Sequence, residues 1–332
     1  MIRQVVAFIS IFAAYMLAGC SSETQANLSS PSTALSLASK YHPVQKGWSL
    51  VWNDEFTAAE IDRTKWEPEV SCWGGGNNEH QCYTDRPENI RIEDGLLKLI
   101  ARPELFSGPK FPQGYEDRRE TISREYTSGK IRTRQKASWK YGRMSARIKL
   151  PKGQSTWPAF WMMPADDVYG GWPLSGEIDI MEAINLTANC ETCETKAETR
   201  SSAALHFGEL WPDNEFITKK RNLGDLESLD DFHEFALEWG EGQFNWFVDG
   251  DKFFTASQDD WFTPSVSGLE NPHAPFDQAF YLMLNLAVGG RYPDTNNAKE
   301  FNPASFPSEL WVDWVRVYQC TEDIETGRAC LQ

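Results

Sequence analysis

The sequence has no excess of positive charge. Its 48 Asp and Glu residues outnumber 32 Lys and Arg residues, which gives a formal net charge of −16. Such a chain repels polyanions at long range, which argues against a nucleic-acid partner. The same repulsion disfavours a sulfated glycan and mildly favours a neutral polysaccharide.

Helical periodicity is also missing, since no long stretch repeats its apolar residues every 3.6 positions. Short alternating segments with turn residues between them are present instead. Asp94-Gly95 and Asp249-Gly250 each separate two such segments and predict hairpins, and Ser145–Leu150 and Trp311–Tyr318 alternate cleanly. Residues 41–332 contain no internal repeat, so we expect one all-β domain, a β-jelly-roll sandwich of two antiparallel sheets with a concave substrate cleft.

Cysteine is scarce, and no second Cys pair or His cluster accompanies Cys190 and Cys193. A redox motif or half of a zinc site is therefore a weaker interpretation of this pair than a loop disulfide. Six cysteines follow Cys20, an even number that favours disulfides in an exported chain. We expect the short-range pairs Cys72–Cys82 and Cys320–Cys330.

The N-terminus has the features of a targeting segment. Arg3 precedes an apolar run that is too short to span a membrane comfortably, and the run ends in Leu17-Ala18-Gly19-Cys20. This tetrapeptide resembles the bacterial lipobox, although an ordinary secretory signal is an alternative. We expect residues 1–19 to be a lipoprotein signal peptide, Cys20 to carry the lipid, and residues 20–40 to form a flexible tether. The resemblance implies a lipid-anchored protein of the bacterial cell envelope, at the outer membrane.

Three carboxylates are interleaved with apolar residues in the segment Glu177-Ile178-Asp179-Ile180-Met181-Glu182. In a regular strand Glu177 and Asp179 share one face, and Glu182 lies on the other. One extra residue near Met181, accommodated as a β-bulge, would return Glu182 to the face of the other two acids. The segment therefore predicts a bulged strand with three acids facing one groove.

Paired carboxylates of this kind suit glycoside hydrolysis. A retaining glycosidase places a nucleophile and an acid/base carboxyl group roughly 5–5.5 Å apart. Nearby Trp157, Trp161 and Trp172 would suit a sugar ring. Solubility of an exposed strand and a calcium site are the alternatives, but calcium loops do not alternate acids with buried isoleucines.

Four segments together resemble glycoside hydrolase family 16, in its laminarinase-like endo-β-1,3-glucanase branch, from about Trp48 to Gln319. They are Trp157-Pro158-Ala159-Phe160-Trp161-Met162, the segment from Gly176 to Glu182, Asp231-Phe232-His233 with Glu238-Trp239, and Asn285-Leu286-Ala287-Val288-Gly289-Gly290. The resemblance implies a β-jelly roll and hydrolysis with retention of anomeric configuration. It also implies that catalysis needs no cofactor.

The resemblance implies roles for individual residues. Glu177 is similar to the nucleophile, Glu182 to the acid/base and Asp179 to the assisting carboxylate. The substrate-binding residues implied are Trp157, Trp161, Trp172, Asn77, His206 and Asn285. A structural Ca²⁺ is implied at Glu55, Gly95 and Asp313, for which unpaired surface acids are the alternative. Gly75 departs from the family pattern, which commonly has Trp there, and Trp73 is the residue that could substitute.

These observations lead to one main hypothesis and two alternatives. The main hypothesis is a retaining, monomeric endo-β-1,3-glucanase that acts on laminarin-like β-glucan. The same chemistry on mixed-linkage β-1,3-1,4-glucan, or on a galactan such as agar or carrageenan, is the nearest alternative. A non-catalytic glycan-binding lipoprotein is the second, but a mere binding site has no use for paired acids.

Overall fold

The structure is a computed structural model that describes residues 47–114, 119–297 and 300–332. The chain divides into two units, Met1–Lys40 and Tyr41–Gln332, and only the second is described. The predicted signal peptide, the predicted lipidation of Cys20 and the predicted tether fall on residues outside the described ranges. Within the described ranges no helix has the length and apolar character needed to cross a membrane.

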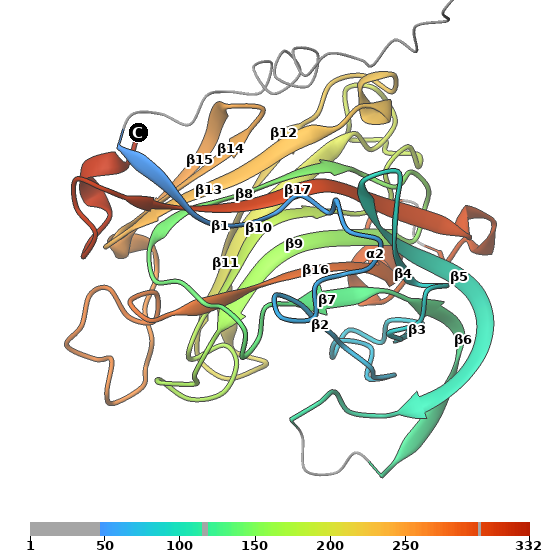
Figure 1. The fold of residues 1–332 in the computed structure, drawn as a ribbon, viewed down its shortest axis with the longest axis horizontal. Helices are drawn as coiled ribbons and strands as arrows, with labels where there is room; N and C mark the ends of the chain where they lie inside the picture. Colours follow the sequence, from blue (N-terminus) through green and yellow to red (C-terminus); the bar gives the residue numbers. More distant parts are fainter. Residues whose placement is uncertain (1–46, 115–118, 298–299) are drawn as a thin grey trace, which may run out of the picture. The chain divides into compact units, whose positions relative to one another are not determined.

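Two sheets form the described domain, and Figure 1 shows their strands. The first has the order β15 (Asp251–Ser257), β14 (Gln243–Val248), β13 (His233–Gly240), β8 (Gly142–Lys149), β17 (Ser308–Cys320), β5 (Leu96–Pro109), β6 (Thr121–Ser128) and β3 (Gln81–Tyr83), with β1 (Trp48–Asp54) on β17 and β4 (Ile90–Glu93) on β5. The second has the order β12 (Asn214–Asn222), β11 (Arg200–Gly208), β10 (Glu177–Ala183), β9 (Thr156–Pro164), β16 (Phe280–Val288), β7 (Lys130–Arg132) and β2 (Glu67–Pro68). A short helix, α2 (Arg291–Thr295), follows β16.

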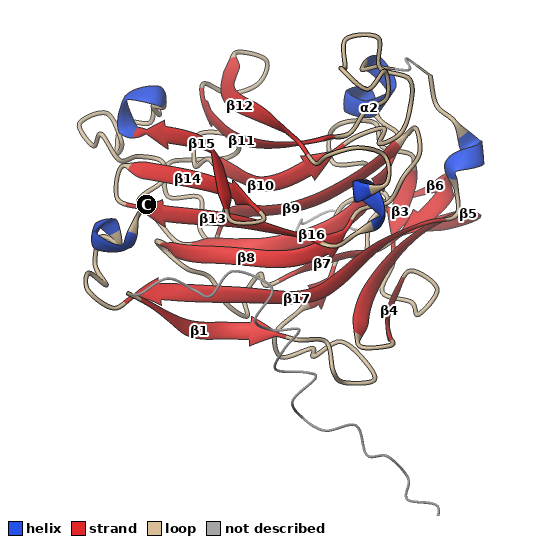
Figure 2. Ribbon diagram, turned by 90° about the horizontal axis from the view of Figure 1, so that it is seen from above, coloured by secondary structure: helices blue, strands red, loops and turns tan. Residues whose placement is uncertain are grey.

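Neighbouring strands pair in antiparallel fashion, apart from the parallel pair β3 and β6. The axes of most strands in both sheets are nearly aligned with one another (Figure 2). The predicted hairpins are present, and Asp94-Gly95 and Asp249-Gly250 have the positive φ angles that a two-residue hairpin turn requires. The predicted all-β sandwich of two antiparallel sheets is therefore confirmed.

Alternation along the seven-stranded sheet separates a core face from a polar face. On β16, Leu282, Leu284 and Leu286 are fully buried in the apolar core, whereas Asn285 points to the other side. Phe160 of β9 and Ile178 of β10 continue the same core face. Burying each such side chain contributes about 1.5–3 kcal/mol, so the apolar residues between the acids hold the register that places the acids on the opposite face.

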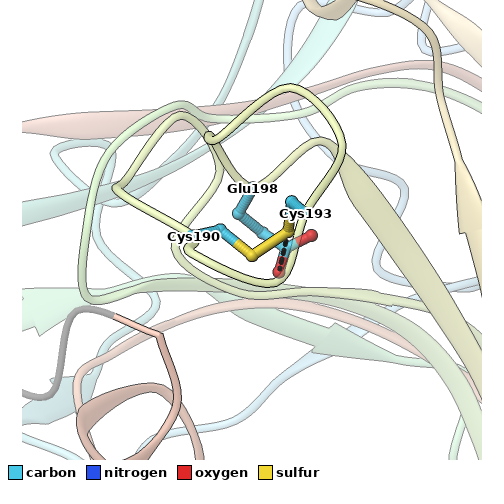
Figure 3. A group of neighbouring side chains, drawn as sticks. All are labelled: Cys190, Cys193 and Glu198. Atoms are coloured by element: carbon cyan, nitrogen blue, oxygen red, sulfur yellow. Dashed lines mark hydrogen bonds between the residues drawn. A yellow bond between two sulfur atoms is a disulfide. The ribbon is translucent and has the colours of Figure 1, made fainter.

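Three disulfides join Cys72 to Cys82, Cys190 to Cys193, and Cys320 to Cys330. All three predicted pairings are confirmed. Figure 3 shows the Cys190–Cys193 bond beside Glu198, whose carboxylate lies 3.8 Å from the Cys193 sulfur. Because these two sulfurs are bonded to each other, neither is a thiolate available to zinc.

Candidate active site

A β-bulge in β10 brings the three acids to one face of the sheet. Against β11, Asp179 pairs with Ala204 and Glu182 with Ser202, so three steps along β10 match two along its neighbour. Against β9 the unpaired residue is Ile180, one position before the residue the sequence suggested. The Trp246 indole donates a hydrogen bond to the Asp179 carbonyl at 3.0 Å, which supports the bulged backbone. We call the side that carries Glu177, Asp179 and Glu182 the acid face.

Two predicted tryptophans hold the two outer acids. The Trp172 indole N–H donates to Glu177 Oε2 at 2.6 Å, and the Trp157 indole N–H donates to Glu182 Oε1 at 2.9 Å. Each bond fixes the direction of one carboxyl group and leaves its second oxygen for another partner. Tyr292 of α2 packs edge-on against Trp157, with 5.3 Å between ring centroids, and so supports the orientation of that indole.

His206 of β11 completes the acid cluster. Its Nε2 lies 3.2 Å from Asp179 Oδ2, and ligand atoms of Glu177, Asp179 and His206 all lie within 4.8 Å of one another. The sequence left open whether this histidine merely fills the core. In the structure it lies directly opposite Glu177 across the β10–β11 ladder and is part of the charged cluster.

Burial and mutual charge perturb the protonation of these groups. Burial and, next, the charge of Asp179 raise the pKa of Glu177 to about 7 and that of Glu182 to about 8, although His206 partly opposes the rise. Burial alone would lower the pKa of His206, but its bond to Asp179 and the charges of Glu177 and Glu182 outweigh this and raise it to about 10. The cluster thus combines a carboxyl group that retains a proton near neutrality with a cation beside the acids.

Trp161 of β9 and Asn285 of β16 lie together on the side of β10 that is away from β11. The Trp161 indole donates to Asn285 Oδ1 at 2.7 Å, and Asn285 Nδ2 donates to the Tyr83 hydroxyl at 3.2 Å. The Lys130 ammonium lies 4.9 Å from the Trp161 ring centroid. Asn285, buried and polar, therefore has the partners that a buried amide needs.

Tyr83 and Lys130 were not identified from the sequence, and neither was Glu79. The Tyr83 hydroxyl lies 3.5 Å from Glu79 Oε2, and Gln81 Nε2 donates to the same oxygen at 2.6 Å. Burial raises the pKa of Glu79. The run of polar residues from Asn77 to Tyr83 was the available signal, but only the fold brings it beneath Asn285.

Asn77 is the first residue of this run and lies in the loop before β3. Its backbone carbonyl accepts a hydrogen bond from the Arg291 N–H at 2.7 Å, and its side chain donates to the Gly75 carbonyl at 3.3 Å. No described contact joins the Asn77 side chain to the acid cluster. Trp73 is exposed in the same loop, and its ring lies beside Gly76.

The residues predicted to hold calcium either pair with arginines or lie in an exposed turn. Both Glu55 oxygens accept hydrogen bonds from the Arg316 guanidinium at 2.8 Å, and Asp313 Oδ2 accepts one from Arg147 at 2.6 Å. Gly95 occupies the exposed hairpin turn between β4 and β5. Arginine charges neutralise both carboxylates in this structure, and the calcium site at these residues stays a prediction.

Over most of its length this chain is similar to known proteins. Residues 48–320 match the family described as Beta-porphyranase A-D, GH16 domain. The chain is 36% identical over 294 residues to the glucan endo-1,3-beta-glucosidase A1 of Niallia circulans, covering 86% of this chain but 40% of that protein, and so spans less than half of it. It is 37% identical over 281 residues to the beta-glucanase of Rhodothermus marinus, covering 83% of this chain and 86% of that protein. The solved laminarinase from Rhodothermus marinus is similar with a TM-score of 0.64 and 35% identity, covering 82% of this chain and 97% of that chain.

Proposed function

Because this chain belongs to glycoside hydrolase family 16, we propose that it is a retaining endo-β-1,3-glucanase that cleaves laminarin-like glucan. One observation carries the proposal: the bulge in β10 places Glu177 and Glu182 on one face, and both have raised pKa values. The laminarinase and glucanases to which the chain is similar support the choice of β-glucan as substrate.

Glu177 acts as the nucleophile in this reaction, and its carboxylate attacks the anomeric carbon. The bond from that carbon to the glycosidic oxygen breaks, and Glu182 gives its proton to the departing oxygen. Water then enters, Glu182 removes a proton from it, and the oxygen displaces Glu177 from the sugar. Both carboxyl groups return to their initial states.

The neighbouring residues serve these steps. Of the two outer acids, Glu182 has the higher pKa, which suits the proton donor. Asp179 adds negative charge that helps Glu182 keep its proton, and His206 offsets that charge near the nucleophile. Trp157, Trp161 and Trp172 would line the sugar-binding region with Asn285, and Asn77 would contribute from the loop before Glu79.

Substitution of each acid tests these roles. Glu177→Gln and Glu182→Gln should each abolish hydrolysis of laminarin while the far-ultraviolet circular dichroism spectrum is retained. Added azide should restore cleavage of an activated aryl β-glucoside by Glu177→Ala with an α-glycosyl azide as product, and by Glu182→Ala with a β-glycosyl azide. Wild-type rates on laminarin in either Gln variant would contradict the assignment.

Cleavage of a galactan is the second candidate, because the matching family description names a porphyranase. The absence of Trp at Gly75 also points away from a laminarinase-type platform there. Reducing-end release from laminarin, lichenan, agarose, carrageenan and porphyran by one enzyme preparation distinguishes these substrates. Binding to any of them without release would favour the non-catalytic alternative.

We further propose that the protein is a monomer that is lipid-anchored through Cys20 at a bacterial outer membrane. The Leu17-Ala18-Gly19-Cys20 tetrapeptide supports this location. Metabolic labelling with a palmitate analogue should tag the wild type but not Cys20→Ser. A tagged Cys20→Ser variant would contradict the lipid anchor. The oligomeric state is tested separately: light scattering of a chain that begins after Cys20 should give the mass of one chain, and a higher mass would contradict the monomer.

A further inference from the structure

The order of strands indicates the path of a polysaccharide over the acid face. Glu177 and Glu182 follow one another along β10 and must flank the bond that breaks, so the glycan crosses β10 and extends over strands on both sides. On one side lie β9 and β16 with Trp161 and Asn285. On the other side lie β11 and then β12, the last strand of the sheet in this order.

Phe216 lies on β12 in line with the nucleophile. Glu177 pairs with His206, and His206 pairs with Phe216, so the three side chains project from the same face of neighbouring strands. The Phe216 and His206 rings stack with 5.5 Å between centroids and 28° between planes. Ile217, the next residue, points to the opposite face and packs against the core.

Core packing does not explain this phenylalanine, because it remains 57% exposed. An exposed aromatic residue on an edge strand favours unwanted association, and edge strands usually carry charged residues instead. The adjoining Lys219, Lys220 and Arg221 fit that pattern, whereas Phe216 does not. Its ring has a supporting neighbour in His206 and an exposed surface, as a stacking platform for a sugar requires.

We propose that Phe216, supported by His206, is a platform for a sugar ring in the leaving-group part of the polysaccharide. The inference rests on the proposed function, and it assigns the side of β9 and β16, with Trp161, to the donor part of the glycan and the side of β12 to the leaving-group part. The apolar face of a pyranose would pack against the exposed part of the Phe216 ring. A glycan that reaches beyond β11 would gain this contact, and a substrate that ends at the broken bond would not.

Two substrates separate this role from a general effect on the enzyme. Laminarihexaose supplies leaving-group sugars, whereas 4-nitrophenyl β-laminaribioside carries only an aryl leaving group. Phe216→Ala should lower kcat/KM about tenfold on laminarihexaose, mainly through KM, and change it less than twofold on the aryl substrate. Phe216→Tyr should retain most wild-type activity on both.

Lys219→Ala is the matched control, because this exposed residue lies on the same strand and points away from the acid face. Its kinetics should match the wild type, and thermal melts should show that all variants are folded. Unchanged laminarihexaose kinetics in Phe216→Ala, or an equal loss on both substrates, would overturn the platform while the glucanase proposal stands. A wild type that cleaves no β-1,3-glucan would instead refute the proposed function and, with it, this assignment.

Discussion

Replacing His206 with Gln should shift the pH dependence of catalysis toward alkaline pH. The substitution removes a positive charge beside the acids and keeps a side chain that can donate a hydrogen bond to Asp179. The positive charge of His206 lowers the pKa values of both Glu177 and Glu182. Without it, both pKa values rise, so both limbs of the bell-shaped profile move upward.

The size of the shift follows from the separation of the charges. The nearest ligand atoms of His206 and Glu177 are at most 4.8 Å apart. At that distance two unit charges interact with about 3.5 kcal/mol at an effective dielectric constant near 20, and with about 0.9 kcal/mol in bulk water. Since one pKa unit corresponds to about 1.4 kcal/mol, the acidic limb should move up by about 0.6–2.5 pH units.

The assay is kcat/KM against pH on the best substrate of the wild type. His273→Gln is the control, because this histidine lies 3.9 Å from Glu241 and outside the acid cluster. Its profile should coincide with that of the wild type. An unmoved acidic limb in His206→Gln, or a limb shifted toward lower pH, would refute the assigned electrostatic role of the histidine.

Three further predictions concern binding and stability. Asn285→Ala leaves the Trp161 N–H without its hydrogen-bond acceptor. The KM for the polysaccharide should therefore rise about tenfold, and the free energy of unfolding should fall by about 1–3 kcal/mol. Unchanged values of both would contradict the role of this hydrogen bond. Glu182→Gln should raise the melting temperature at pH 8 but not at pH 4. A carboxyl group whose pKa is raised on folding stabilises the fold below its unfolded pKa and loses that contribution as pH rises through about 8. A difference in melting temperature that does not depend on pH would contradict this. Removing the Cys190–Cys193 disulfide by double Ser substitution should cost about 1 kcal/mol less than removing Cys72–Cys82, because it closes a shorter loop, and chemical denaturation would show the reverse order if other contacts dominate.

The local sequence pattern was sufficient to predict the hairpins and the disulfides of the fold. Asp-Gly pairs between alternating segments predicted the hairpins at Asp94 and Asp249 because few other residues adopt the φ angles these turns need. Short spacing in the sequence predicted the disulfides, because cysteines a few residues apart on a turn meet easily. The pairing of Glu55 and Asp313 with arginines could not be predicted in this way, because those arginines come from strands distant in sequence.

Within the site, the sequence alone determined which carboxylates share a face, because a strand has a period of two and one extra residue reverses it. Only the tertiary structure decided how these carboxylates hold protons. Their pKa values depend on burial and on His206, which lies on another strand. Tyr83 and Phe216 likewise reach the site through pairing between strands that the linear pattern does not specify. A residue's type and spacing thus determine its local direction, whereas its electrostatic surroundings arise from segments that only folding brings together.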